Sequence, residues 1–185
     1  MSRIGLTNFH YAPLLTDTAE GATYGPPVAV PGIITASVNP ASSSATLYAD
    51  NAPAEVGNTL GEITVEIALK DLPIQHQAAL LGHTVAAGVM TSAGTDVAPY
   101  VAIMFEGLKA SGKKKFVKLL KGMFNVPNDT YETKKESINF QTDKITGKFV
   151  VREFDSKWKL TAEEDATGYL PATGSAWYTS VENQA

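Results

Sequence analysis

The stretch LGEITVEIAL, residues Leu60–Leu69, indicates the fold class more clearly than any other part of the chain. Apolar side chains occupy every second position within it, namely Ile63, Val65, Ile67 and Leu69. This period of two is typical of a β-strand with one buried face. Glu62 and Glu66 alternate with the apolar residues, so we expect them to point away from the core.

Further β-strands are expected on both sides of this stretch. They are Phe9–Leu15, Ile33–Val38, Ser44–Ala49, Tyr100–Leu108, Ile138–Thr142 and Ile145–Phe154. The dipeptide Asn39-Pro40 is expected to interrupt the chain between two of them, and Asp143-Lys144 is expected to turn the last two into a hairpin. Loops are predicted at Thr16–Pro27, Ala49–Thr59 and Thr91–Val97, because these segments are rich in turn-forming residues.

One short helix is predicted over Pro73–Leu81. Proline suits the first turn of a helix, and Gly82 stands where a helix commonly ends in a left-handed residue. With many short strands and a single helix, the sequence predicts a mainly β fold of two packed antiparallel sheets, a sandwich or barrel, flanked by one short α-helix. The length of 185 residues suits one domain.

The net charge of −4 conceals three blocks of opposite sign. Residues 1–106 carry −7, residues 107–160 carry +7 and residues 161–185 carry −4. Such blocks indicate complementary surfaces, which could meet within one molecule or between copies. The acidic end is loosely patterned, although Trp177 and Tyr178 could anchor it.

The segment Gly107–Lys114 nearly matches a phosphate-binding P-loop. It fits G-x-x-x-x-G-K, but Lys114 stands where a P-loop needs a Ser or Thr hydroxyl for Mg²⁺. Apolar residues at helical spacing between 116 and 123 leave a strand–loop–helix open as an alternative. We favour a β-hairpin that turns at residues 110–113 and carries Lys113, Lys114 and Lys115 as a solvated or partner-facing cluster.

No other residue pattern predicts catalysis, a cofactor or a metal site. The chain has no cysteine, and its three histidines lack ligand spacing. Glu62 and Glu66 would lie about 13 Å apart on one strand, which exceeds the separation of glycosidase carboxylates. A solvated or subunit-facing strand is the preferred interpretation. No apolar run is long enough to span a membrane, no signal peptide is visible, and synthesis in the cytoplasm is expected.

The chain as a whole resembles the major tail proteins of long-tailed, non-contractile bacteriophages. The resemblance follows a series of segments in order: Arg3–Ala12, Ser44–Asp50, Gly61–Val65, Asp71–Pro73, Leu80–His83, Ala98–Ala102, Phe105-Glu106, Lys121–Phe124, Phe140–Thr142, Ile145–Gly147 and Trp158. It covers roughly residues 1–160, which would form the tail-tube β-sandwich domain. Residues 161–185 would then form a C-terminal acidic arm.

The resemblance implies a structural virion protein rather than an enzyme. Six copies would form a ring, and rings would stack into the tail tube around a tape-measure protein. The tube would also meet tail terminator and distal tail proteins, with DNA only as cargo passing through the lumen and no membrane insertion. Its place would be the virion tail, after assembly in the cytoplasm of the bacterial host.

Subunit contacts are expected in the lysine hairpin and in the loops Ala49–Thr59 and Thr91–Val97. The candidate contact residues are Asp50, Asn51, Glu62, Glu66, Lys113, Lys114 and Lys115. An alternative hypothesis is a monomeric β-sandwich module that binds carbohydrate or another surface through exposed aromatic residues. An enzyme built on the near P-loop is a third hypothesis.

Overall fold

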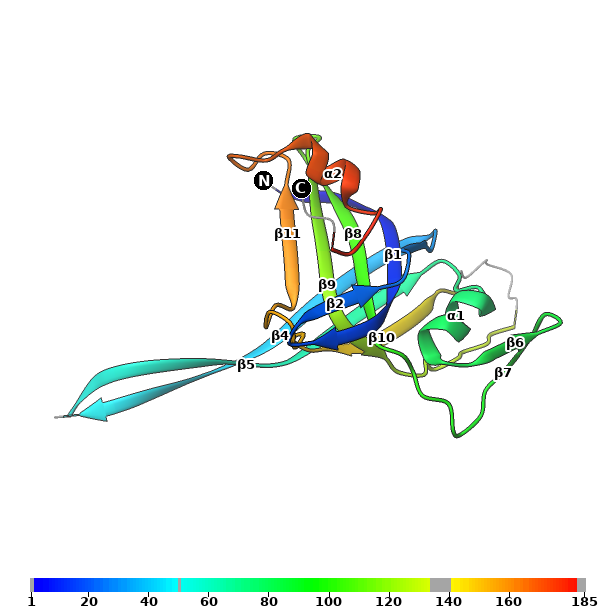
Figure 1. Cartoon of the computed structure of the whole chain (residues 1–185), viewed down its shortest axis with the longest axis horizontal. Helices are drawn as coiled ribbons and strands as arrows, with labels where there is room; N and C mark the ends of the chain where they lie inside the picture. The colour runs from blue at the N-terminus through cyan, green and yellow to red at the C-terminus, as the bar shows by residue number, and fades with distance from the viewer. Residues whose placement is uncertain (1, 50, 134–140, 183–185) are drawn as a thin grey trace.

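The computed structural model describes residues 2–49, 51–133 and 141–182, which form a mainly β fold with a long hairpin projecting from its body (Figure 1). Its strands are β1 (Arg3–Thr18), β2 (Gly21–Tyr24), β3 (Val28–Ala29), β4 (Ile33–Ala49), β5 (Ala52–Leu69), β6 (Thr84–Ala86), β7 (Val89–Thr91), β8 (Val101–Lys109), β9 (Lys114–Phe124), β10 (Asp143–Phe149) and β11 (Lys159–Glu163). Its helices are α1 (Ile74–Leu81) and α2 (Pro171–Ala176).

The strands form a large and a small antiparallel sheet. The nine-stranded sheet has the order β2-β1-β8-β9-β10-β5-β4, with β3 paired to β1 and β11 paired to β9, and β6 and β7 form the two-stranded sheet. Helix α1 lies beside the small sheet, and α2 lies over another end of the body (Figure 1). The predicted fold class, mainly β with two antiparallel sheets and a short flanking helix, is confirmed.

The large sheet surrounds the main core, to which β1, β5, β8, β9, β10 and α1 all contribute. Strand β9 is buried on both faces, because Val117 and Leu119 face this core while Phe116 and Leu120 face a second apolar cluster. Trp177 of the C-terminal segment covers that second cluster and is only 3% exposed. Strand β11 crosses the domain boundary expected at residue 160 and pairs with β9. The start of the acidic C-terminal segment is therefore part of the sheet.

The strand that indicates the fold class lies in β5. Ile63, Val65, Ile67 and Leu69 are buried, as the alternation predicts. The predicted helix is α1, and Gly82 ends it with a left-handed φ of 75° and an N–H bond to the Ala78 carbonyl. A Cβ at Gly82 would lie 2.2 Å from the carbonyl oxygen of Val97, so a side chain there has no room.

Two predictions about the chain around residue 50 are wrong. Asn39-Pro40 does not interrupt the strand, because β4 continues from Ile33 to Ala49. Proline has no N–H to donate, but β4 ends the sheet order, and the ladder is irregular between Pro40 and Ser42. The expected loop Ala49–Thr59 is mostly strand, because β5 begins at Ala52 and pairs with β4 along its length. Strand pairing overrides the local turn-forming composition there.

The predicted hairpin around Asp143-Lys144 is also wrong. These residues begin β10 and pair with Leu69 and Ala68 of β5, so they do not form a turn. Residues 138–140 lie outside the described part of the chain, and the next two residues are not in a strand. Strand β10 ends at Phe149, earlier than expected, and its partners are β5 and β9.

Candidate self-assembly surface

The most exposed part of the fold is the projecting hairpin, which we define as residues 40–60. Strand β10 pairs with β5 only between Ile63 and Leu69, so farther out β4 and β5 pair with each other alone among the described residues. Every described residue from 39 to 62 is exposed. Figure 1 shows this two-stranded ribbon leaving the body. The projecting hairpin thus packs against no core within the described part of its own chain.

Large apolar side chains are nevertheless present on the projecting hairpin. They are Leu47, Tyr48, Val56 and Leu60, with exposed fractions of 60%, 67%, 66% and 45%. The register places Val56 opposite Thr46 and Leu60 opposite Ser42, so these two apolar residues share one face of the ribbon. An isolated two-stranded hairpin is marginally stable in water, and exposed apolar patches mark interaction sites. The projecting hairpin therefore has the character of a segment that a partner covers.

The strand edges of the projecting hairpin carry no lysine that would discourage such a partner. Natural edge strands commonly carry lysine, which discourages pairing with another chain. No Lys or Arg occurs between Ile33 and Leu60, and the charged residues there are Asp50 and Glu55. Both long edges of the ribbon are thus open to neutral or basic partners.

Of the two candidate contact residues at the tip, Asn51 is exposed between β4 and β5 and has a φ of 64°. Asparagine tolerates this left-handed conformation better than most residues. Asp50 lies outside the described residues.

Glu62 and Glu66 lie on the outward side of β5, next to lysines of β10. The Glu62 carboxylate lies 2.8 Å from Lys148 Nζ, and the Glu66 carboxylate lies 3.0 Å from Lys144 Nζ. Exposed ion pairs of this kind contribute about 0–1 kcal/mol. The two carboxylates are thus paired within the chain, which fits the interpretation of a solvated strand and leaves a subunit-facing role untested.

The lysine cluster sits at the β8–β9 turn, as the hairpin interpretation predicts, and its members differ in environment. Lys113 is exposed. Lys114 Nζ lies 2.9 Å from the carboxylate of buried Glu106, and this hydrogen bond raises the pKa of Lys114. Lys115 Nζ lies 2.6 Å from the carboxylate of Glu163. Two of the three lysines are therefore already neutralised, which makes Lys113 the strongest remaining candidate for a contact between copies.

The strand–loop–helix alternative for residues 107–123 is wrong. The residues after the turn form β9, so no helix begins at the position where a P-loop would hold phosphates. The helical spacing of Phe116, Leu119 and Leu120 arises because β9 is buried on both faces, so its apolar residues do not alternate.

The charge blocks meet within the molecule. The nearly buried Lys109 contacts the carboxylates of Glu163 and Asp165, at 2.6 and 2.5 Å. Lys121 pairs with Asp17 at 2.6 Å, and Arg152 pairs with Glu182. Hydrogen bonds from Lys109 and then Lys115 lower the pKa of Glu163 to about 2. The basic middle of the chain thus holds both acidic ends against the body.

Lys118 is the most unusual charged residue of the described chain, because its side chain is fully buried. Its Nζ donates to the carbonyl oxygens of Ser180 and Val181, at 3.1 and 3.0 Å. The same nitrogen lies 4.6 Å from the centre of the Trp177 ring. Burial lowers the pKa of Lys118 to about 8. Lys118 of β9 therefore connects the C-terminal segment to the large sheet through these hydrogen bonds.

The described residues contain no group of three or more His, Asp or Glu side chains that could hold a metal ion. Within the same residues, no helix is both long and apolar enough to cross a membrane. No protein-family model matches the chain, and a comparison with curated proteins finds no match.

Sequence reasoning placed contact residues near the tip of the projecting hairpin but missed the hairpin itself. A signal was present in the apolar residues Val56 and Leu60, which are four apart and hence on one face of any strand. The Asp, Asn, Pro and Gly residues between 49 and 59 outweighed it, because their composition is typical of loops.

Proposed function

We propose that this protein is a structural subunit that self-assembles into the stacked hexameric rings of a bacteriophage tail tube, the conduit for DNA ejection. The observation that carries the proposal is the projecting hairpin, whose large apolar side chains have no partner among the described residues of their own chain. A second copy is the simplest partner for such a segment. The tail-tube assignment itself draws on the sequence resemblance described above.

The ring of six, the tape-measure, terminator and distal tail partners, and the place in the virion tail belong to this same proposal. The internal charge pairing is compatible with it, because pairs such as Lys109–Glu163 already join the opposite charges within each subunit. Assembly would then rely on the projecting hairpin and other neutral surfaces rather than on the bulk charge blocks.

The proposal is tested by following the oligomeric state of purified protein as its concentration rises. Light scattering should show growth beyond the 19.6 kDa monomer, and negative-stain images should show rings or tubes. Serine substitution of Leu47, Tyr48 and Val56 together should block this growth, because it removes the exposed apolar side chains without touching the core. A monomer at every concentration and salt would refute the proposal, and a monomer that binds glycans would favour the carbohydrate-binding alternative.

The matched control is serine at Val97 and Val126, which are 76% and 71% exposed but lie outside the projecting hairpin. This variant should assemble like the wild type. If the control and the hairpin variant lost assembly equally, general surface apolarity rather than the projecting hairpin would be responsible.

A further inference from the structure

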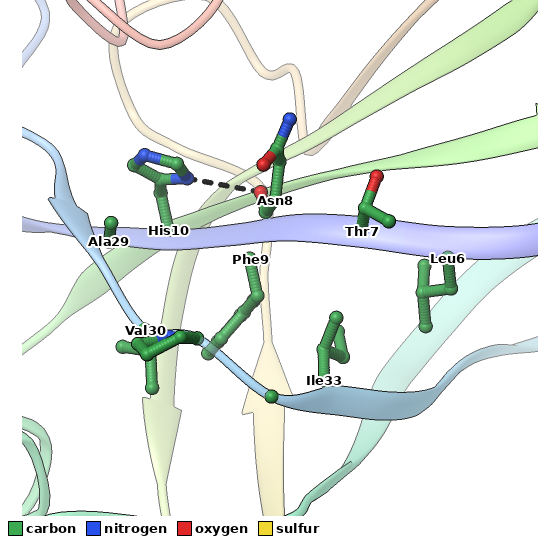
Figure 2. Close-up of a pocket in the computed structure, with 10 residues that line it drawn as sticks. Leu6, Thr7, Asn8, Phe9, His10, Ala29, Val30 and Ile33 are labelled. Atoms are coloured by element: carbon green, nitrogen blue, oxygen red, sulfur yellow. Dashed lines mark hydrogen bonds between the residues drawn. The ribbon is translucent and has the colours of Figure 1, made fainter.

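An apolar slot lies on the body at the other end of the strand that forms the projecting hairpin. It has a volume of about 310 Å³ and is lined by residues 6–10 of β1 and by residues 29–33, which lead into β4. In Figure 2, Leu6 and Phe9 point from β1 toward the residues leading into β4, and Ile33 points back toward β1. Phe9 and Val30 are each 1% exposed and form its floor. The slot therefore offers a mostly apolar recess to a side chain from outside.

The backbone beside the slot is also open. Among the described residues, β1 pairs with β8 from Arg3 onward. On its other edge, β3 pairs only with His10 and Tyr11, and β2 pairs with β1 only from Leu14 onward. The N–H of Val30 closes one end of the slot by donating to the carbonyl of Phe9, at 2.8 Å.

Two β-bulges extend the apolar character of the slot onto the surface. The β1–β8 register skips Ile4, and the β4–β5 register skips Ile34. Bulges re-aim a side chain, and these two isoleucines are 67% and 48% exposed. Each lies on a strand that borders the slot, so both strands carry an exposed isoleucine near their slot residues.

A lysine lies beside the slot in an otherwise acidic part of the chain. The first 106 residues contain two cationic side chains, Arg3 and Lys70, against nine acids. Arg3 precedes Ile4 on β1, and the backbone N–H of Lys70 donates to the carbonyl of Gly32 at the slot, at 2.7 Å. Among the described residues, neither cation forms an ion pair.

The projecting hairpin is the complement of this slot, since large apolar side chains lie in the strands next to its tip and its charged residues are acids. It cannot reach the slot of its own chain, because Ile33 and Tyr48 lie 15 residues apart on one continuous strand, a distance of about 50 Å. We propose that the tip of the projecting hairpin of one copy docks on this slot of a second copy, with Tyr48 near the exposed Ile34 and Glu55 beside Lys70.

This contact joins two different surfaces of the chain, so each added copy presents a new slot or a new tip. Such heterologous contacts propagate in one direction unless a rotation closes them into a ring. The inference rests on the proposed self-assembly and adds the receiving surface, which the sequence analysis did not identify.

The absence of cysteine in the chain allows a direct test by cross-linking. Copies carrying Ile34→Cys are mixed with copies carrying Tyr48→Cys under assembly conditions and treated with a short bis-maleimide. The mixture should give a covalent dimer that neither single variant gives alone. In the control mixture, Val97→Cys replaces Ile34→Cys, and the dimer yield should fall to background. Thermal unfolding confirms that each variant is folded.

A charge exchange provides the second measurement. Lys70→Glu should raise the concentration at which assembly begins by about fivefold, equivalent to about 1 kcal/mol. Adding Glu55→Lys should restore it. Tubes or rings that form without the Ile34–Tyr48 cross-link would overturn the slot inference while the proposed function stands. A protein that stays monomeric would overturn both.

Discussion

Replacing Lys118 with methionine should change how the stability of the protein depends on pH. Burial lowers the pKa of Lys118 from 10.5 to about 8 in the folded chain, so the unfolded chain binds this proton more tightly. Protonation at neutral pH therefore favours unfolding. The stability lost in this way should return as the pH rises from about 8 to 10.5. Met fills a similar volume without a charge, so Lys118→Met should lack this dependence.

The size of the effect follows from the two pKa values. At 1.36 kcal/mol per pKa unit, the charged Lys118 lowers the stability of the folded state by about 3 kcal/mol at pH 7, and most of this should be recovered by pH 10. The nearby charges act in opposite directions, because Glu182 favours the protonated form and Arg152 disfavours it. At pH 7, Lys118→Met also leaves the carbonyls of Ser180 and Val181 without their donor, which offsets part of its gain.

The assay is urea unfolding of wild type and Lys118→Met at pH 7 and at pH 10. Subtracting the two proteins removes the contributions of all other titrating groups, including tyrosines such as Tyr24 whose pKa burial raises. The free energy of unfolding of Lys118→Met minus that of the wild type should fall by about 2–3 kcal/mol from pH 7 to pH 10. Lys113→Met, at an exposed position, serves as the control and should show a constant difference. If the stability difference between wild type and Lys118→Met is the same at both pH values, Lys118 does not titrate in the way its burial implies.

Three further pairs of substitutions test the packing of the fold by chemical or thermal unfolding. Ile67→Ala should lower the free energy of unfolding by about 2–5 kcal/mol, because Ile67 is fully buried in the main core. Glu66→Ala should lower it by less than about 1 kcal/mol, because the pair with Lys144 is exposed. The opposite order would mean that the β5 register is one residue out. Gly82→Ala should lower the free energy of unfolding more than Gly88→Ala does. Both glycines have a positive φ, but of the two only Gly82 lacks room for a Cβ. Equal losses of stability would contradict the close approach of Val97. Lys114→Ala should lower the free energy of unfolding by about 1–3 kcal/mol, because buried Glu106 loses one of its partners. Lys113→Ala, at an exposed position, should change it by less than about 0.5 kcal/mol. Equal effects would show that the Lys114–Glu106 pair contributes nothing.

The parts of the fold that local patterns control were predictable from the sequence. The alternation in β5 gave both the strand and its buried face, because a period of two follows directly from strand geometry. Helix α1 and its end at Gly82 were predictable for the same kind of reason, since proline and glycine act through their own backbone. The turn between β8 and β9 was also placed correctly at residues 110–113.

The errors arose where pairing partners decide the structure. Pro40 does not end β4, because its missing donor lies in an edge strand, and being at an edge is a property of the whole sheet. Asp143 and Lys144 belong to β10 because β5 pairs with them across more than 70 residues of sequence. Neither fact is visible in the residues next to them. The charge pairs of the C-terminal segment likewise depend on which strand it lies against.

The projecting hairpin combines both kinds of information, and this is why it bears on function. Its residues are those of a loop, yet it is held as two paired strands that meet no other part of the described chain. The main core does not require these side chains, so Tyr48 and Val56 are better explained by a contact outside the monomer than by folding. The slot at the opposite end of β4 is mostly apolar, and it has an exposed isoleucine, Ile34, on the strand beside it and a cation at Lys70. Two unmatched surfaces separated by about 50 Å along one strand are what a head-to-tail assembly needs from its subunit.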